Sequence, residues 1–376
     1  MTSQPKGRPT YCTIDLAALR WNFNRVKKLV GPSVKVLSVV KANAYGHGAA
    51  ACARALADAG SDAFGVATVE EAVELRRAGV EGPLLVLTAI CLEQLDEFLN
   101  YALTPALSDL HTIASFEKLL QKRGAALKFH LKIDSGMGRL GLLHSAIDAW
   151  LPEVAKLKAL RLEGMFSQLA NSDGDADYSA EQVKNFRAAE ERLRAAGLAP
   201  SELHLANSGG VIGVPDAHGT MVRPGIMLYG CCPGPALAEK ADLKPVLAWY
   251  TRIMQVKELP AGASVGYGRT FAAKRKSRIA ALPLGYADGY HRLLSNRGAV
   301  LVRGKRAPVA GRISMDLTMI DVTDIAGVTQ GDEVVLIGRQ GAENISADEV
   351  AGWAETISYE VLTSVSARVP RVHLNS

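Results

Sequence analysis

The sequence of this 376-residue chain has few of the features that mark membrane, redox or metal-binding proteins. No apolar run is long enough to span a bilayer, and residues Met1 to Pro9 are polar and contain no apolar signal core. The five cysteines form no CxxC pair and show no metal-ligand spacing with histidine. We therefore expect a reduced, cytoplasmic protein without a metal site; a periplasmic form processed before Met1 is the alternative that the sequence leaves open.

Basic residues are present but are not concentrated in one region. The formal net charge is only +5, and no stripe of Lys and Arg with interleaved aromatic residues occurs, so we expect no nucleic-acid partner. Acidic small molecules remain suitable ligands. The hydrophobic content of 48% and the charged content of 22% are those of an ordinary soluble globular protein. This length suggests either two domains or one large barrel with an addition.

Short apolar runs alternate with amphipathic helical patterns between about residues 34 and 230. Eight strands separated largely by helices predict a (β/α)8 barrel of the TIM type. An open, doubly wound sheet is the alternative, but it usually has fewer strands, and no GxGxxG turn follows the first strand here. The helical patterns include Ala49–Ala59, Val69–Ala78, Thr112–Lys122 and Ala180–Ala196. The predicted strands are Val34–Lys41, Ala63–Ala67, Leu84–Thr88, Thr104–Asp109, Leu127–Asp134, Leu160–Leu169, Glu202–Asn207 and Met221–Tyr229.

After Pro245 the pattern changes to strand-like runs separated by glycine turns, and only Ser346–Thr356 has a convincing helical pattern. We therefore predict an α/β chain in which a mainly-β domain follows the barrel. Its predicted strands are Leu247–Val256, Ser277–Pro283, Ala299–Val302, Thr318–Val322 and Glu333–Ile337. The predicted parts are an N-terminal segment 1–12 that packs with the β domain, the barrel at 13–245 and the β domain at 246–376.

The predicted strand Leu127–Asp134 alternates strictly between apolar and polar residues. The outer face of a barrel strand packs under helices, so the polar residues of this strand should point into the lumen. They are Lys128, His130, Lys132 and Asp134. A buried lysine is costly unless it is paired or modified, which makes Lys132 a candidate functional residue.

One lysine lies where α/β proteins place their chemistry. Strand-forming residues Val34 to Val40 lead directly into Lys41, and a turn rich in small residues follows. If it is partly desolvated, a lysine at the end of a barrel strand has a lowered pKa and can act as a nucleophile and base. These are the properties of a lysine that forms a Schiff base. For Lys41 taken alone, a solvated lysine at a strand end remains the alternative.

Eight motifs, in order and with compatible spacing, closely resemble those of alanine racemases. These are pyridoxal phosphate (PLP) enzymes with an N-terminal barrel and a C-terminal β domain. The resemblance extends from about Thr13 to Val372 and implies interconversion of L-alanine and D-alanine, which supplies D-alanine for peptidoglycan. The motifs are Val40–Gly48, Lys132–Gly141, His204–Ser208, Met221–Gly230, Val265–Gly268, Gly285–Tyr290, Gly311–Val322 and Ser358–Pro370.

The resemblance implies that Lys41 binds PLP covalently and is one of two catalytic bases. Residues Asn207 to Gly210 follow a strand and open a short helix, so a hydroxyl group and backbone amides meet there in a site suited to an anion. For Ser208 alone, a helix cap is the ordinary explanation. By the resemblance, the PLP phosphate binds groups of Tyr45, Ser208, Gly225, Ile226 and Tyr359.

Arg223, at the end of the last barrel strand, matches the arginine that faces the pyridine nitrogen of PLP in this family. An arginine stays charged and only donates hydrogen bonds, so it disfavours protonation of that nitrogen, and we expect this to discourage transamination. Relatives commonly have a histidine where this chain has Gln168, and that histidine bonds the arginine. We expect Gln168 to take the place of the histidine beside Arg223, in a chain of hydrogen bonds that continues from Arg223 towards His204. Because glutamine does not titrate, modest changes in kinetics or pH dependence should follow.

Racemisation needs a base on each face of the substrate α-carbon. Tyr267 matches the second base, which in this family reaches the active site of the other subunit, so we expect a head-to-tail homodimer with shared sites. Met315 and Asp316 match residues across the same interface, where the Met315 amide contacts the substrate carboxylate. Arg139 matches the residue that bonds the phenolic oxygen of PLP and neighbours the substrate carboxylate. Lys132 matches a lysine that is often carbamylated, and the resulting anion would hold Arg139.

Three other functions compete with alanine racemisation. One is a serine or broad-spectrum amino-acid racemase of the same family. Tyr359 favours alanine over these substrates because it narrows the substrate pocket in this family, and Lys132 is typical of the alanine enzymes. A PLP decarboxylase of the same barrel class is another, but the late Cys-Asp pair of those enzymes does not occur here. PLP-binding barrel proteins without turnover lack a β domain, whereas this chain has about 130 residues after Pro245.

Overall fold

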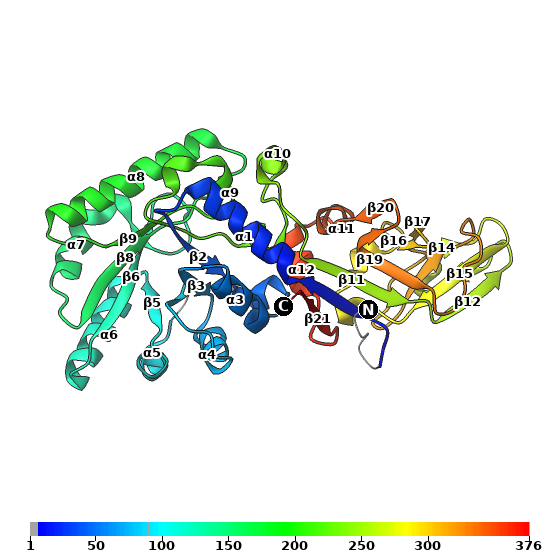
Figure 1. The fold of residues 1–376 in the computed structure, drawn as a ribbon, viewed down its shortest axis with the longest axis horizontal. Helices are drawn as coiled ribbons and strands as arrows, with labels where there is room; N and C mark the ends of the chain where they lie inside the picture. The colour runs from blue at the N-terminus through cyan, green and yellow to red at the C-terminus, as the bar shows by residue number, and fades with distance from the viewer. Residues whose placement is uncertain (1–6, 89, 376) are drawn as a thin grey trace. The chain divides into compact units, whose positions relative to one another are not determined.

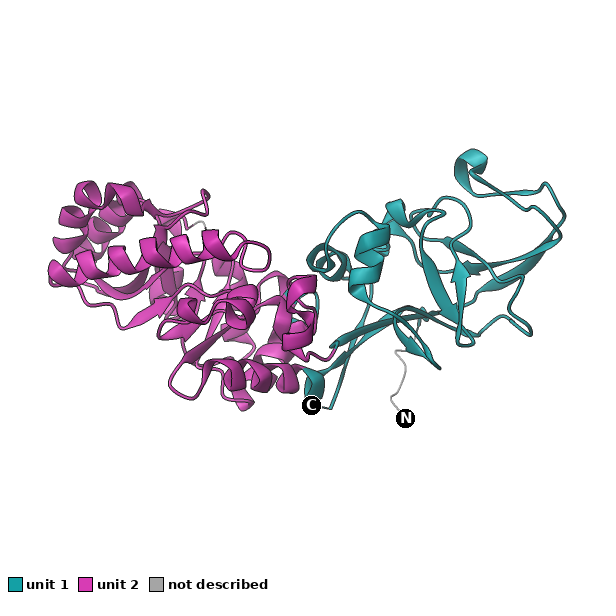
Figure 2. Ribbon diagram, turned by 90° about the horizontal axis from the view of Figure 1, so that it is seen from above, with its two compact units in different colours: residues 1–18, 45–48, 245–376 teal, residues 19–44, 49–244 magenta. Residues whose placement is uncertain are grey.

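The computed structural model describes residues 7–88 and 90–375, and the chain forms two compact units, shown in Figures 1 and 2. Of the described residues, 19–44 and those within 49–244 form the barrel unit, and 7–18, 45–48 and 245–375 form the β unit. Residues 7–12 of the predicted N-terminal segment group with the β unit; residues 1–6 lie outside the described part.

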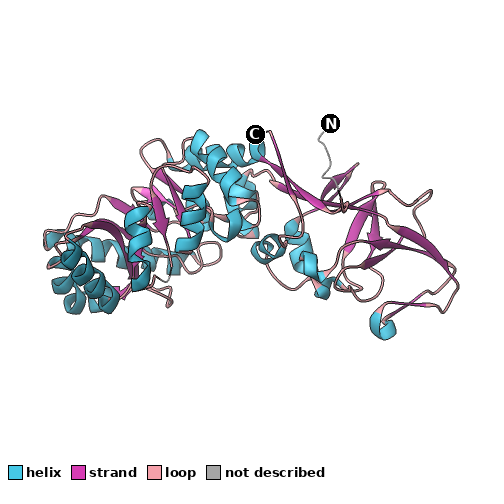
Figure 3. Cartoon of the chain, turned by 90° about the horizontal axis from the view of Figure 1, so that it is seen from below, coloured by secondary structure: helices cyan, strands magenta, loops and turns pink. Residues whose placement is uncertain are grey.

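The strands of the barrel unit lie inside a layer of helices (Figure 3). They are β2 (Lys35–Val39), β3 (Ala63–Val66), β4 (Leu84–Val86), β5 (Thr104–Leu107), β6 (Leu127–Asp134), β7 (Leu142–Leu143), β8 (Leu160–Phe166), β9 (Glu202–His204) and β10 (Met221–Val222). Eight of them are parallel in the order β10-β2-β3-β4-β5-β6-β8-β9, while β7 pairs only with β6. Backbone hydrogen bonds of 2.9 Å from Thr220 to Leu203 and from Arg223 to Ala206 link the two edge strands. The barrel is therefore nearly closed, and the predicted (β/α)8 fold is confirmed.

Helices connect the strands, and several of them begin after a residue whose side chain caps the first turn. Thr68 caps α4 (Val69–Arg77) with a reciprocal capping box, in which Thr68 Oγ1 accepts from the Glu71 amide and the Glu71 carboxylate accepts from the Thr68 amide. The remaining helices of this unit are α1 (Leu16–Val30, of which residues 19–30 belong here), α2 (Lys41–Tyr45, a left-handed turn of which residues 41–44 belong here), α3 (Ala49–Asp58), α5 (Leu95–Asn100), α6 (Leu110–Arg123), α7 (Ile147–Ala155), α8 (Ala176–Ala195), α9 (Ser208–Gly213) and α10 (Ala238–Ala241). Across residues 7–88 and 90–375, no helix is long and apolar enough to cross a bilayer.

One predicted barrel strand, Met221–Tyr229, is wrong in its extent. Only Met221–Val222 belongs to the sheet, and Ile226–Tyr229 forms a 3-10 helix, η4. Pro224 explains the break, because proline has no backbone N–H to donate to a sheet and its φ is fixed. Arg223 follows β10 directly, so its predicted place at the end of the last barrel strand is confirmed.

The alternation predicted for β6 is present. Its four apolar residues are buried, and three of its polar residues are also buried, at 5–6% exposure. In an alternating strand these two sets face opposite sides, so the buried polar set faces the lumen. It consists of His130, Lys132 and Asp134. Lys128 differs from the prediction, since it is exposed at the start of the strand and pairs with Glu163 at 2.6 Å.

The β unit confirms the prediction of a mainly-β second part. Its strands are β1 (Tyr11–Asp15), β11 (Leu247–Arg252), β12 (Gln255–Leu259), β13 (Ser264–Val265), β14 (Phe271–Ala272), β15 (Ser277–Leu282), β16 (Ala299–Val302), β17 (Lys305–Pro308), β18 (Thr318–Asp321), β19 (Glu333–Gln340), β20 (Glu343–Ile345) and β21 (Arg371–Leu374). The largest sheet has the order β17-β16-β19-β11-β1-β21, with β20 on β19. Strands β12, β15 and β18 form a second sheet, and β13 pairs with β14.

Two predictions for the β unit need correction. The predicted strand Leu247–Val256 is two strands, β11 and β12, because the chain changes partner from β19 to β15 between them. The Ile253 amide still donates to Asp332 O, whereas the Met254 amide donates to Ala281 O. A second helix, α12 (Ser358–Ser364), follows α11 (Ala347–Trp353); its β-branched residues are weak helix formers, which hid it in the sequence.

Candidate active site

Lys41 follows β2 after one residue, Val40, and is half-buried. Burial lowers the pKa of its amine, and the nearby cations Arg139 and Arg223 lower it too, while Glu71 opposes the change. A lowered pKa leaves more of the amine neutral and able to act as a nucleophile or base. Lys41 therefore has the environment that its position at a strand end predicts.

The turn that follows Lys41 is left-handed. Residues Ala42 to Tyr45 have φ angles of 52° to 54°, a conformation that costs a non-glycine residue about 1–2 kcal/mol. Two side chains hold the turn in place: Glu71 accepts from the Ala42 amide at 2.6 Å, and Asn43 accepts from the Ala49 amide at 2.8 Å. Sequence reasoning missed Glu71, although its capping-box spacing from Thr68 is visible in the sequence.

Arg223 is only 4% exposed, and its guanidinium group contacts neutral acceptors. Gln168 Oε1 lies 3.0 Å from Nη2, and His204 Nδ1 lies 3.2 Å from Nη1. The guanidinium carbon lies 5.3 Å from the centre of the Phe166 ring. Burial lowers the pKa of Arg223 to about 9. It also donates to the carbonyl oxygens of Ser167, His204 and Leu205.

Lys132 lies in the same part of the barrel. Its ammonium nitrogen is 5.4 Å from the centre of the Phe166 ring, which thus lies near both Lys132 and Arg223. Burial and then the cations Arg139, Arg223 and Lys41 lower the pKa of Lys132 to about 8, against the opposing effect of Asp134. Sequence reasoning missed Phe166, which had no distinguishing signal in an ordinary barrel strand.

Arg139 lies on the exposed loop after β6. Asp134 shapes this loop, because its Oδ1 accepts from the Gly136 and Gly138 amides at 2.9 and 3.1 Å. Arg139 nevertheless lies close enough to Lys41 and Lys132 to lower the pKa of both.

Ser208 opens α9 and is 4% exposed. Asn207 is the cap residue, with its side chain accepting from the Gly210 amide at 2.9 Å. Ser208 Oγ accepts from the Gly225 amide at 2.9 Å and from the Met227 amide at 3.4 Å, so α9 and η4 meet at this hydroxyl. Gly225 and Ile226 begin η4 at the same place.

The other predicted site residues belong to the β unit. Tyr45 and Tyr359 lie together, with ring centres 6.1 Å apart, and burial raises the pKa of Tyr45. Tyr267 is 72% exposed at the start of a 3-10 helix, Tyr267–Arg269. Met315 is also exposed, and Asp316 bonds to Arg368 at 2.7 Å.

The chemistry of the barrel residues suits an anionic cofactor with a reactive carbonyl. Lys41, Lys132, Arg139 and Arg223 form a cluster in which the two arginines lower the pKa of both lysines, with Asp134 as the opposing charge at Lys132. Such a cluster favours an anion, and Lys41 supplies an amine that can add to an aldehyde. PLP has both properties, so these residues fit it.

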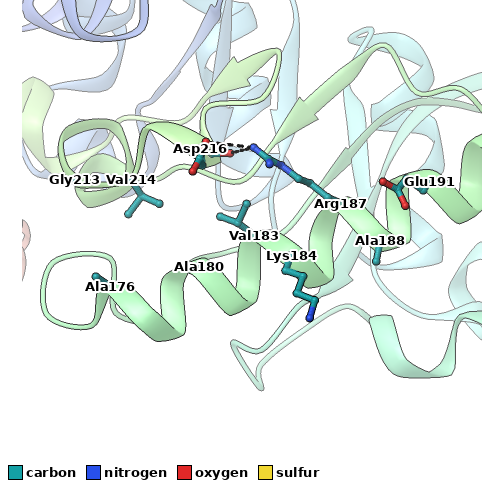
Figure 4. A pocket seen from close by; sticks show the side chains of 10 residues that line it. All are labelled: Ala176, Ala180, Val183, Lys184, Arg187, Ala188, Glu191, Gly213, Val214 and Asp216. Atoms are coloured by element: carbon teal, nitrogen blue, oxygen red, sulfur yellow. Dashed lines mark hydrogen bonds and ion pairs between the residues drawn. The ribbon is translucent and has the colours of Figure 1, made fainter.

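A groove of about 530 Å³ lies elsewhere in the barrel unit, along α8 and the segment after α9 (Figure 4). Across this groove, Arg187 pairs with Asp216 at 3.6 Å. None of the predicted site residues is among the described residues that line it. We therefore place no chemistry in this groove.

Both units match known proteins. The family model for the alanine racemase N-terminal domain matches residues 14–233, and the model for the alanine racemase C-terminal domain matches residues 246–373. The alanine racemase of Halothermothrix orenii is 45% identical over 369 residues, or 98% of this chain and 97% of that protein. The crystal structure of alanine racemase from D-cycloserine-producing Streptomyces lavendulae has a TM-score of 0.94 at 31% identity, covering 99% of this chain and 98% of that one. The structure of alanine racemase from Bacillus anthracis with bound L-Ala-P has a TM-score of 0.93 at 33% identity, covering 99% and 96%.

Proposed function

The chain belongs to the alanine racemase family and is an isomerase that interconverts L- and D-alanine, and we propose that it does so with PLP bound to Lys41 and with two bases, Lys41 and Tyr267. The observation that carries this proposal is the half-buried Lys41 at the end of β2 among Arg139, Arg223 and Lys132. When bound, PLP withdraws electrons from the substrate and weakens its Cα–H bond.

Lys41 and Tyr267 remove and return the proton on opposite faces of the substrate α-carbon. Lys41 suits this role because its lowered pKa leaves part of the amine neutral. Arg223 would face the pyridine nitrogen of the bound cofactor. As a buried group that only donates hydrogen bonds, it opposes protonation of that nitrogen and so favours return of the proton to the α-carbon over transamination.

The remaining predicted residues bind the cofactor and the substrate. The phosphate is held by Tyr45, Ser208, Gly225, Ile226 and Tyr359. Arg139 bonds the phenolic oxygen of the cofactor and, with the Met315 amide, the substrate carboxylate. A carbamate on Lys132 turns a costly buried cation into an anion that holds Arg139.

We also propose a head-to-tail homodimer in which Tyr267, Met315 and Asp316 complete the site of the partner subunit. The exposure of Tyr267 and Met315, at 72% and 53%, supports this, because it leaves both side chains accessible to a partner subunit. The nearby sequence has further exposed apolar residues that a partner would cover. These are Tyr286, Leu293 and Leu317.

Mixing two inactive variants tests the shared site. Lys41→Ala and Tyr267→Phe should each abolish racemisation. After the two proteins are unfolded together and refolded, half of the dimers are mixed, and each mixed dimer has one intact site, so about a quarter of wild-type activity should return. No recovery would contradict the shared site, while loss of activity in the single variants would still support the two bases.

Isotope exchange tests the reaction itself. L-alanine incubated with the protein and PLP in deuterium oxide should yield D-alanine deuterated at the α-carbon. A folded, yellow protein that binds PLP but gives no exchange would overturn the proposal in favour of a binding protein without turnover.

The substrate is proposed to be alanine, with serine or a broader set of amino acids as the second candidate. Tyr359 favours a small side chain, and racemisation rates for L-alanine, L-serine and L-lysine decide between them. We further propose that the enzyme works in the cytoplasm and supplies D-alanine for peptidoglycan. Failure of a deletion strain to grow without added D-alanine would support that role.

A further inference from the structure

A chain of four polar side chains runs through the lumen of the barrel unit to Arg223. Glu163 Oε2 faces His130 Nε2 at 3.7 Å. His130 Nδ1 lies 2.7 Å from His204 Nε2, and His204 Nδ1 lies 3.2 Å from Arg223 Nη1. The two histidines are 5% and 0% exposed, so these contacts are shielded from solvent.

The protonation of both histidines follows from the ends of this chain. Arginine has only donors, so His204 Nδ1 must be the acceptor and the proton of a neutral His204 must lie on Nε2. His130 Nδ1 then accepts a hydrogen bond from the N–H at His204 Nε2. The proton of a neutral His130 therefore lies on its Nε2, where it faces the carboxylate of Glu163. Burial, together with the charge of Arg223, lowers the pKa of His204, which keeps it neutral. Every group in the chain therefore has one consistent role.

The backbone is arranged to place Glu163 and His130. In the pairing of β6 with β8, Phe129 is opposite Leu162 but His130 is opposite Gly164, so Glu163 is an extra, bulged residue. A β-bulge redirects the side chain that it carries. Gly164 leaves room for the imidazole, because a Cβ atom built there would lie 2.5 Å from His130 Nδ1.

Glu163 lies at the opposite end of the barrel from Lys41. It lines a cavity of about 300 Å³ together with residues at the starts of several strands, among them Lys35, Ala63 and Thr104. The facing His130 and the Lys128 ammonium hold the pKa of Glu163 at about 2, so it is ionised at neutral pH. These four side chains thus connect a carboxylate at the solvent-accessible cavity to a buried arginine at the end of the barrel where Lys41 lies.

We propose that Glu163 and His130 are positioning residues, which fix the tautomer of His204 and thereby the orientation of the Arg223 guanidinium group. The tautomer depends on the fold alone, whereas its effect on catalysis rests on the proposed function, in which Arg223 faces PLP. Gln168 holds the other guanidinium nitrogen, so loss of the histidine contact leaves Arg223 held by Gln168 and by carbonyl oxygens.

Nitrogen NMR of the cofactor-free protein labelled with ¹⁵N-histidine tests the tautomer. His204 should carry its proton on Nε2, and the exposed His111 serves as a reference for a histidine outside the chain. His130→Asn keeps an acceptor near the position of Nδ1 and should preserve this signal, whereas His130→Leu and Gly164→Ala should alter it. A proton on Nδ1 of His204 in the wild-type protein would overturn the proposal, whatever the enzyme's activity.

Kinetics with PLP and alanine test the consequence. His130→Leu should lower kcat about 10- to 100-fold with little change in KM, the range seen when a group that orients a histidine is removed. His130→Asn should recover most of that loss. Glu163→Gln should reduce kcat. Glu202→Gln is the matched control and should not, because Glu202 lines the same cavity but pairs with Lys35. Equal kcat in His130→Leu and the wild type, with the variant folded, would refute the positioning role. If neither the wild type nor any variant racemises alanine but the tautomer of His204 is as expected, only the proposed function fails.

Discussion

Replacing Lys132 with methionine should stabilise the cofactor-free protein at neutral pH. The side chain is 6% exposed, and a fall in its pKa from 10.5 to about 8 corresponds to a cost of about 3 kcal/mol for burying the charge. Methionine has similar length and flexibility and no charge, so Lys132→Met should remove most of that cost. In buffer free of carbon dioxide at pH 7, the variant should therefore be more stable than the wild type by about 3 kcal/mol.

The pH dependence of this difference follows from the direction of the pKa shift. Below pH 8 the lysine is charged in both the folded and the unfolded chain, so the whole cost is present. Between pH 8 and 10.5 the folded chain has lost the proton and the unfolded chain retains it, so the cost falls as pH rises. At pH 10 the advantage of the variant should be below about 1 kcal/mol.

Urea-induced unfolding followed by circular dichroism measures both quantities. Lys118→Met, at an exposed position on α6, is the matched control and should show no comparable gain. Adding ¹³C-bicarbonate should raise the stability of the wild type and produce a carbamate signal in ¹³C NMR that Lys132→Met lacks. The reasoning from buried charge would be refuted if the variant were the less stable protein at pH 7, or if the difference were the same at pH 7 and pH 10.

Three further substitutions test individual contacts. Glu117→Gln should destabilise the barrel unit by about 2–4 kcal/mol in urea unfolding, because the buried carboxylate accepts from the amides of residues 158–160 and glutamine has only one acceptor oxygen. Ala42→Gly should raise stability by about 0.5–1 kcal/mol in the same assay, since glycine adopts the left-handed turn without strain and Ala42 is exposed; a loss would show that the turn is not strained. Gln168→His should shift the pH–rate profile or the absorption spectrum of the bound cofactor, because a titratable group then contacts Arg223; if neither changes, Gln168 does not tune the site.

Part of the site could be predicted because its signals are local. Lys41 stands at the junction of a strand pattern and a turn, and strict alternation in β6 marked His130 and Lys132 as lumen-facing residues. Both signals depend on periodicity within a few residues, which a single sequence contains. The roles assigned to Tyr267, Met315 and the phosphate-binding groups came from resemblance and remain proposals.

Other features depend on contacts between residues distant in sequence. Glu163 faces His130 only because β8 bulges against β6, and no property of Leu160–Phe166 alone reveals a bulge. Likewise, Glu71 supports the turn after Lys41 because α4 follows the neighbouring strand in the barrel.

The sequence by itself located the eight barrel strands and several of the helices, showed that a mainly-β part follows the barrel, and fixed where the chemically capable side chains lie along the chain. These follow from the periods of side-chain burial, which are set by backbone geometry and need no knowledge of neighbours. Only the tertiary structure decided which groups meet, such as the path from Glu163 to Arg223, and which charges are buried enough to change their pKa. Register, bulges and desolvation arise from packing one element on another, so they are properties of the folded barrel and not of any one segment.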